Sequence, residues 1–137
     1  MSRRSLPKRP EIQVTAGDYD RLAALADAAA DAFPAVADFL ADELERARII
    51  DAAEAKGAVQ MHSTVTYRDT ETGEEHTVTL VYPGEADIEA GRLSVLTPVG
   101  VALIGLRRGQ TITWITPSGK PRNLTVVRVE PAPAAVA

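Results

Sequence analysis

The spacing of apolar residues changes from a helical to an alternating pattern before the middle of the chain. Up to about residue 50, apolar positions recur at intervals of three and four, which is typical of helices with one buried face. A first helix is predicted to begin after Thr15, whose hydroxyl can accept a hydrogen bond from a first-turn amide. Its apolar positions are Tyr19, Leu22, Leu25 and Ala29. The helix should end at Phe33, because the residue before Pro34 is pushed out of helical geometry.

A second helix is predicted from Pro34 onward. Its apolar face is formed by Val36, Phe39, Leu40, Leu44 and Ala47. The opposite face, expected to be exposed to water, carries Asp42, Glu43, Glu45, Arg46 and Arg48. The break between the two helices is short, so we expect an antiparallel coiled-coil hairpin. With about 15 residues in each helix, the hairpin would be roughly 22 Å long.

From Val59 onward, apolar and polar residues alternate as they do in half-buried strands. In the first strand, one face is predicted to carry Val59, Met61, Ser63, Val65 and Tyr67. Further strands are predicted at residues 77–82, 93–96, 111–116 and 124–129. Residues 51–59, which include Gly57, are interpreted as a linker between the helices and the strands.

One short helix interrupts the predicted strands. Thr97 can cap its first turn and Pro98 presets the backbone for a first helical position, while Gly105 and Gly109 end it. A helix this short is not stable alone in water, so it must pack on a sheet. The predicted fold class is α+β: a two-helix hairpin followed by a small, mostly antiparallel sheet. The predicted segments are a disordered arm (1–11), the helical hairpin (12–52), the sheet domain (53–130) and a disordered tail (131–137).

Composition narrows the functional classes. The chain has 137 residues, a formal net charge of −4, two histidines and no cysteine, which excludes disulfides and thiolate metal sites. The negative net charge argues against a protein that binds nucleic acid without sequence preference, because such a binder needs a basic face. No apolar run approaches the ~20 residues that cross a bilayer, and the basic start lacks the apolar core of a secretory signal. We therefore expect a cytoplasmic protein with no membrane partner.

Candidate chemistry is sparse. The chain has no phosphate-binding or dinucleotide-binding glycine motif and no nucleophile elbow, so we expect no catalytic residues, no cofactor and no metal. Asp27, Asp31 and Asp38 would lie near the hairpin tip, where they could hold a divalent ion or simply be solvated. The acidic residues 85–87 could present charge to a basic partner. The apolar residues 99–106 could serve as core or as part of a docking groove.

The stretch around the short helix resembles the carboxy-terminal domain of the bacterial Gre transcript-cleavage factors. The resemblance is carried by Ser94-Val95, Thr97-Pro98, Ala102-Leu103-Ile104-Gly105 and Gly109. It extends to Val81-Tyr82-Pro83, Asp87 and the Thr116-Pro117-Ser118-Gly119 turn. Two features are closer to the Rnk branch of this family: the apolar Val101, where Gre factors usually carry a basic residue, and the helix from Pro34 to Ala47.

This resemblance implies an FKBP-like domain that docks on RNA polymerase at the entrance of its secondary channel. The partner-binding residues it implies are Asp87, Ser94 and Pro98. Gre factors have a much longer coiled coil with an acidic tip motif that nothing here matches, so their metal-binding carboxylates have no counterparts in this chain. We therefore expect a regulator of transcription elongation that competes with Gre factors, does not stimulate transcript cleavage and makes no sequence-specific nucleic-acid contact.

Alternatives from other classes stay open. The domain could be an FKBP-like peptidyl-prolyl isomerase, although such a pocket needs an aromatic lining and aromatics are 4% of the chain. It could be a helper in metal-assisted nuclease chemistry, or an interaction module that binds another protein through the helical hairpin. The Rnk branch is named for regulation of nucleoside diphosphate kinase. No residue here explains that activity, so an indirect effect through transcription is the favoured interpretation.

Overall fold

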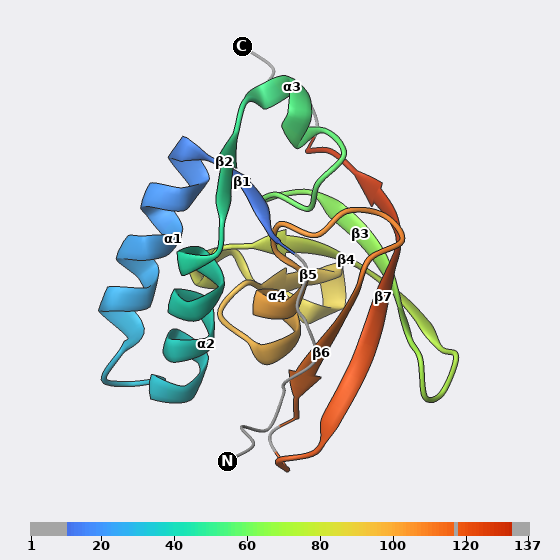
Figure 1. Cartoon of the computed structure of the whole chain (residues 1–137). Helices are drawn as coiled ribbons and strands as arrows, with labels where there is room; N and C mark the ends of the chain where they lie inside the picture. The colour runs from blue at the N-terminus through green and yellow to red at the C-terminus, as the bar shows by residue number, and fades with distance from the viewer. Residues whose placement is uncertain (1–10, 117, 133–137) are drawn as a thin grey trace, which may run out of the picture.

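The computed structural model describes residues 11–116 and 118–132 (Figure 1). The helices and strands, in chain order, are β1 (Gln13–Thr15), α1 (Ala16–Ala29), α2 (Pro34–Glu45), β2 (Arg48–Ile50), α3 (Ala52–Ala55), β3 (Thr64–Asp69), β4 (Glu75–Val81), β5 (Arg92–Ser94), α4 (Pro98–Leu103), β6 (Thr111–Ile115) and β7 (Pro121–Glu130). Two 3-10 turns, η1 (Pro83–Glu85) and η2 (Ile88–Ala90), connect β4 to β5. The predicted disordered arm and tail fall almost entirely outside the described residues.

Five strands form one curled sheet in the order β5-β4-β3-β7-β6. The pairs β3–β4, β3–β7 and β6–β7 are antiparallel, while β4–β5 is parallel. The mostly antiparallel sheet is therefore confirmed. The parallel pair arises because the connector with η1 and η2 returns the chain to the start of the neighbouring strand. Helix α4 lies between α2 and β6 (Figure 1), so the predicted packing of the short helix against the sheet is also confirmed.

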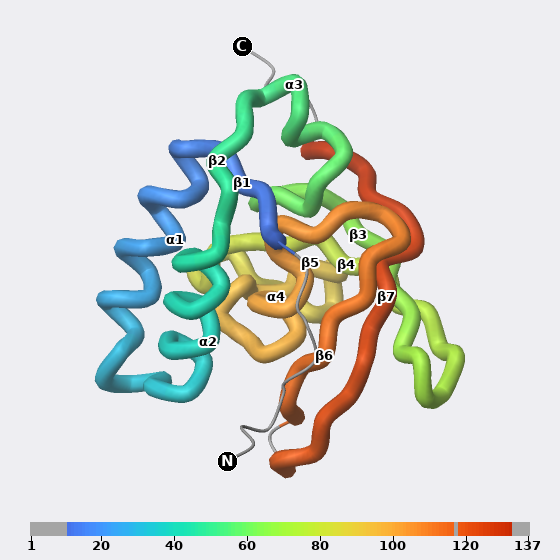
Figure 2. Tube along the Cα trace, viewed as in Figure 1, coloured from blue at the N-terminus to red at the C-terminus, as the bar shows by residue number. Residues whose placement is uncertain are grey.

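The two predicted helices are present and lie side by side as a hairpin (Figure 2). Thr15 caps α1 by accepting a hydrogen bond from the Asp18 amide at 3.3 Å, and Pro34 is the first residue of α2. The strands β1 and β2 were not predicted. They pair in parallel, Gln13 with Arg48 and Thr15 with Ile50, and so join the two ends of the hairpin. Three residues are too few to show an alternating pattern in a sequence.

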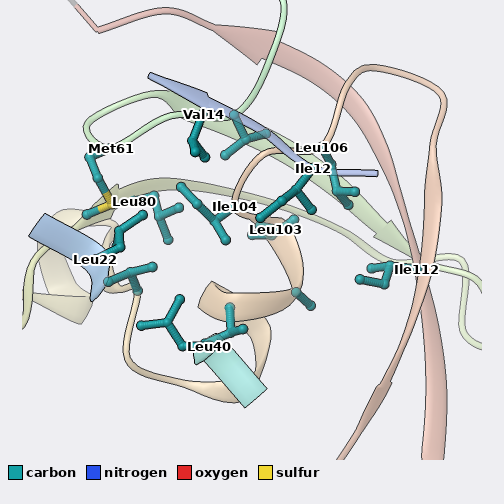
Figure 3. Packing of buried hydrophobic residues seen from close by; sticks show 14 of the residues in the cluster. Ile12, Val14, Leu22, Leu40, Met61, Leu80, Leu103, Ile104, Leu106 and Ile112 are labelled. Atoms are coloured by element: carbon teal, nitrogen blue, oxygen red, sulfur yellow. The ribbon is translucent and has the colours of Figure 1, made fainter. Parts of the chain in front are cut away.

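The hairpin and the sheet share one cluster of buried apolar side chains (Figure 3). Fully buried members from the hairpin segment include Ile12, Leu22 and Leu40. Those from the sheet segment include Leu80, Leu103, Ile104, Leu106 and Ile112. Neither segment buries its apolar face alone, because each covers the other. The division into segments at residue 52 stays a prediction.

The predicted linker at residues 51–59 is wrong in part. It contains the short helix α3, and both Ala58 and Val59 are fully buried. The following strand begins at Thr64, later than predicted, because residues 58–63 form an irregular segment packed on the core. Within it His62 has a left-handed φ of 70°. Contrary to the prediction, His62 is therefore not part of a strand.

The exposed face predicted for α2 is also wrong at one position. Glu43 is fully buried, and its carboxylate accepts a hydrogen bond from Arg46 Nη2 at 2.6 Å. Glu43 lies three residues after Leu40 and next to Leu44, within the face that α2 turns to the core. Burial of a carboxylate is costly unless it is paired, and Arg46 supplies a partner. In α1 the predicted apolar face is present: Leu22 and Ala29 are buried, Tyr19 and Leu25 pack half-buried against the core, and Ala26 is buried beside them.

Candidate protein-interaction surface

The connector between β4 and β5 carries Asp87, the first predicted partner-binding residue. Asp87 is exposed, and its Oδ1 accepts a hydrogen bond from the Ala90 amide at 3.4 Å, which caps η2. Its backbone exchanges two hydrogen bonds with Arg92, at 3.0 and 2.8 Å. The turn ends at Gly91, whose φ of 75° is left-handed and therefore suits glycine. The connector is thus a hydrogen-bonded turn, in which the Asp87 charge has a defined position.

The first part of this connector is fastened by a histidine–glutamate pair. His62 Nε2 lies 2.9 Å from Glu85 Oε1, and the same oxygen accepts a hydrogen bond from the Tyr82 amide at 3.3 Å. These hydrogen bonds, with that from His62 the stronger influence, hold the pKa of the Glu85 carboxyl below its ordinary value. The His62 ring also packs edge-on against Tyr82, with ring centroids 5.9 Å apart.

Ser94 and Pro98 flank the turn between β5 and α4. Ser94 Oγ accepts a hydrogen bond from the Leu96 amide at 3.0 Å, and the Ser94 carbonyl accepts one from Thr97 Oγ1 at 2.9 Å. Thr97 Oγ1 in turn accepts from the Gly100 amide at 3.0 Å, which confirms the predicted cap of the short helix. A side chain at Gly100 would collide with the Ser94 carbonyl oxygen. The turn therefore needs glycine at this position to stay closed.

The three predicted contact residues lie on different elements: Asp87 in the connector, Ser94 at the end of β5 and Pro98 at the start of α4. Asp87 pairs with Arg92 at the start of β5, whereas Pro98 follows the end of that strand. Pro98 instead lines a groove of about 730 Å³ between α2, α4 and the end of β6. The groove is lined by Ala35, Val36, Asp38, Phe39, Asp42, Pro98, Ile115, Thr116 and Gly119.

Of the three acidic residues considered for the hairpin tip, only Asp38 lines this groove. Asp27 lies near the end of α1 and Asp31 in the turn between the helices, and both are exposed. Within residues 11–116 and 118–132, no three His, Asp or Glu side chains gather in a group that could hold a metal ion. The sequence pattern therefore placed these carboxylates near one another along the chain, but the fold does not bring them together around one point.

Two exposed apolar residues near these positions were not predicted from the sequence. Ile88 has 76% of its surface exposed and sits between Asp87 and Glu89 in η2. Ile115, at 51% exposed, stands at the groove. The exposure of Ile88 could have been predicted, because it is an isoleucine in the middle of an otherwise acidic connector. For Ile115 the available signal was its spacing, because a residue three positions after the buried Ile112 lies on the opposite face of an alternating strand.

Comparison with known proteins identifies the family from both halves of the chain. The family model described as the C-terminal part of transcription elongation factor GreA/GreB matches residues 54–131. The model described as the Rnk N-terminus matches residues 10–50. The chain belongs to the GreA/GreB family. Its amino-terminal match assigns it to the Rnk branch, so the resemblance noted in the sequence is confirmed.

Individual relatives agree with this assignment. The regulator of nucleoside diphosphate kinase of Escherichia coli K12 is 38% identical over 128 residues, which cover 93% of this chain and 94% of that protein. Transcription elongation factor GreA of Cereibacter sphaeroides is 44% identical over 86 residues, which cover 63% of this chain and 56% of GreA. The Rnk-type relative thus aligns along nearly its whole length, whereas only about half of GreA does.

The GreA/GreB fold is seen directly in a solved relative. The structure of the prokaryotic transcription elongation factor GreA/GreB from Nitrosomonas europaea has a TM-score of 0.69 and 37% sequence identity, and it covers 89% of this chain and 99% of that chain. By their names, the relatives of this Rnk-branch protein are a regulator and transcription elongation factors. No helix among the described residues is long and apolar enough to span a membrane.

Proposed function

We propose that this Rnk-branch protein is a cytoplasmic transcription regulator that binds RNA polymerase at the entrance of the secondary channel. In this proposal it competes there with Gre factors and does not stimulate transcript cleavage. The observation that carries the proposal is the match of residues 54–131 to the carboxy-terminal part of GreA/GreB. The resemblance implies that this part, as an FKBP-like domain, is the one that docks on the polymerase.

The connector geometry supports a docking role for Asp87. Its carboxylate is exposed, and the backbone around it is held by hydrogen bonds to Arg92 and Ala90. A charge with a defined position contributes mainly to specificity and association rate. Ser94 and Pro98 would contribute through shape, because they set where α4 begins.

The dimensions of the hairpin support the absence of cleavage stimulation. With 14 residues in α1 and 12 in α2, the helices are about 21 and 18 Å long. A hairpin of this length would end well short of a catalytic centre deep in a channel.

Co-elution with purified core RNA polymerase tests the association. We expect the protein to elute with the polymerase and an excess of it to displace a bound Gre factor. Absence of co-elution would contradict the proposal, and simultaneous binding of both proteins without mutual effect would contradict the shared site. With a backtracked elongation complex, we expect no acceleration of transcript cleavage. Robust Mg²⁺-dependent acceleration would refute this part of the proposal.

Substitution of Asp87 by asparagine tests the contact surface. Asp87→Asn keeps the oxygen that accepts from the Ala90 amide but removes the charge, so the turn should persist. Loss of one partner of a desolvated charge pair costs about 2 kcal/mol or more of binding free energy. Asp31→Asn, at the hairpin tip, is the matched control and should bind normally. Pro98→Ala should weaken binding and also lower stability slightly, because it frees the backbone where α4 begins.

The alternative of a prolyl isomerase receives little support from the groove beside Pro98. Its described lining contains one aromatic residue, Phe39, beside the carboxylates of Asp38 and Asp42. An interaction with another protein through the hairpin remains the competing proposal, since α2 forms one wall of this groove. Normal polymerase binding by Asp87→Asn together with a loss in Asp38→Asn would instead place the polymerase contact on the hairpin.

A further inference from the structure

Ile88 is the most exposed of the large hydrophobic residues in the described part of the chain. It has 76% of its surface exposed, against 58% for Phe33, 51% for Ile115 and 49% for Ile49. Single apolar residues are common on protein surfaces and need no functional explanation by themselves. What distinguishes Ile88 is the rigid backbone on which it stands and the charge around it.

The backbone around Ile88 is held on both sides. The Ile88 carbonyl accepts a hydrogen bond from the Gly91 amide at 3.0 Å, and the Gly91 carbonyl accepts one from Thr79 of β4 at 2.7 Å. Immediately before Ile88, Asp87 pairs with Arg92 through two backbone hydrogen bonds. The isoleucine is therefore displayed in a fixed position. Binding through it would cost little ordering of the backbone, which is the usual benefit of preorganisation.

The surroundings of Ile88 are mostly acidic. Asp87 and Glu89 are its direct neighbours and are exposed, and Glu85 lies at the end of the preceding turn. Arg92 is the one basic residue of this connector and its junction with β5. An exposed apolar side chain with acidic neighbours is complementary to an apolar pocket on a partner that is bordered by basic residues. Interfaces commonly concentrate their affinity in such a buried anchor, while the charged rim controls the association rate.

We infer that Ile88 is the apolar anchor of the polymerase contact and inserts into a socket that is lined by apolar side chains and bordered by lysine or arginine. This inference rests on the proposed function and adds to it a residue and the chemistry of the partner surface. Asp87 then guides the approach of the two surfaces, whereas Ile88 holds them together.

The test measures the affinity of core RNA polymerase for the full chain and its variants at two salt concentrations. Ile88→Ala should weaken binding at least about tenfold, mainly through faster dissociation. Ile88→Leu should retain most of the affinity. Ile49→Ala removes another half-exposed isoleucine, on β2, and should bind as the unchanged protein does. Equal thermal unfolding midpoints of all variants would show that the fold is unaffected.

Salt separates the anchor from the charge. The loss in Ile88→Ala should be nearly the same at low and high salt, because contact between apolar groups is not screened. The loss in Asp87→Asn should shrink as salt increases. Normal binding by Ile88→Ala, with Asp87→Asn weakened, would overturn the anchor and leave the proposed function standing. Failure of the unchanged protein to bind polymerase would overturn both.

Discussion

The base and the tip of the helical hairpin are held in different ways. At the base, Ile12 and Val14 are fully buried, and β1 and β2 pair with one another. At the tip, residues 30–33 form an exposed turn, and Phe33 caps α2 without a side-chain hydrogen bond. The base of the hairpin is therefore stabilised by buried contacts and strand pairing. The turn at the tip is stabilised mainly by contacts within the two helices.

The hydrogen bonds of the two ends differ in sequence separation. At the base, the Gln60 side chain accepts from the Thr15 amide and donates to the Gln13 carbonyl, and the Asp18 carboxylate accepts from the Met61 amide. At the tip, backbone hydrogen bonds join residues close in the sequence, such as the Phe33 amide, which donates to the Ala29 carbonyl. The base thus fixes the direction of the hairpin relative to the sheet. The tip is free to vary in sequence with little effect on stability.

The largest effect is expected from removing a buried side chain at the base. Ile12→Ala should lower the free energy of unfolding by about 3 to 4 kcal/mol, because it leaves a cavity in the shared core. Phe33→Ala, at the tip, should cost less than about 1 kcal/mol because most of that ring is exposed. Chemical denaturation measures both values. Equal losses would show that the two ends are packed alike.

The second-largest loss of stability is expected at Gly105, where the backbone lies close to Ile12. Gly105 has a φ of +79°, and a Cβ there would lie 2.5 Å from the Ile12 Cβ. Gly105→Ala should therefore cost about 3 kcal/mol through backbone strain and overpacking. Gly109 has a φ of +87° but open space around it, so Gly109→Ala isolates the strain at about 1 to 2 kcal/mol. An identical cost for the two substitutions would remove the evidence for tight packing at the base.

Substitution of Gln60 tests the long-range hydrogen bonds at the base separately from apolar packing. Gln60→Ala should cost about 1 to 3 kcal/mol, since it leaves the Thr15 amide and the Gln13 carbonyl without this partner. The amide hydrogen of Thr15 should also exchange faster, which hydrogen exchange measured by NMR would detect. Unchanged exchange at Thr15 would mean that this bond does not hold β1 in place.

The smallest effect is expected at the tip. Asp31→Ala changes an exposed residue in the turn between the helices, so unfolding should change by no more than about 0.5 kcal/mol. Polymerase binding should stay the same as well. If Asp31→Ala weakened polymerase binding while Asp87→Asn did not, the contact would lie on the hairpin and the connector assignment would be wrong.

Local signals in the sequence determined much of the fold. The cap at Thr15, the start of α2 at Pro34 and the short helix after Thr97 depend on neighbouring residues, and all three are present. The family was also readable in the sequence, because the residues around Pro98 form a contiguous motif. The candidate contact residues Asp87, Ser94 and Pro98 came from that motif, and their role stays a proposal.

Contacts between distant segments were decided only by the tertiary structure. The strands β1 and β2 exist because the ends of the hairpin meet, and Glu43 is buried because α2 turns that face to the core. Asp18 and Gln60 find partners more than 40 residues away. The exposure of Ile88 likewise depends on how the connector closes against β4 and β5. Periodicity and capping report on a residue's neighbours in the chain, whereas burial and long-range hydrogen bonds depend on which surfaces come together when the chain folds.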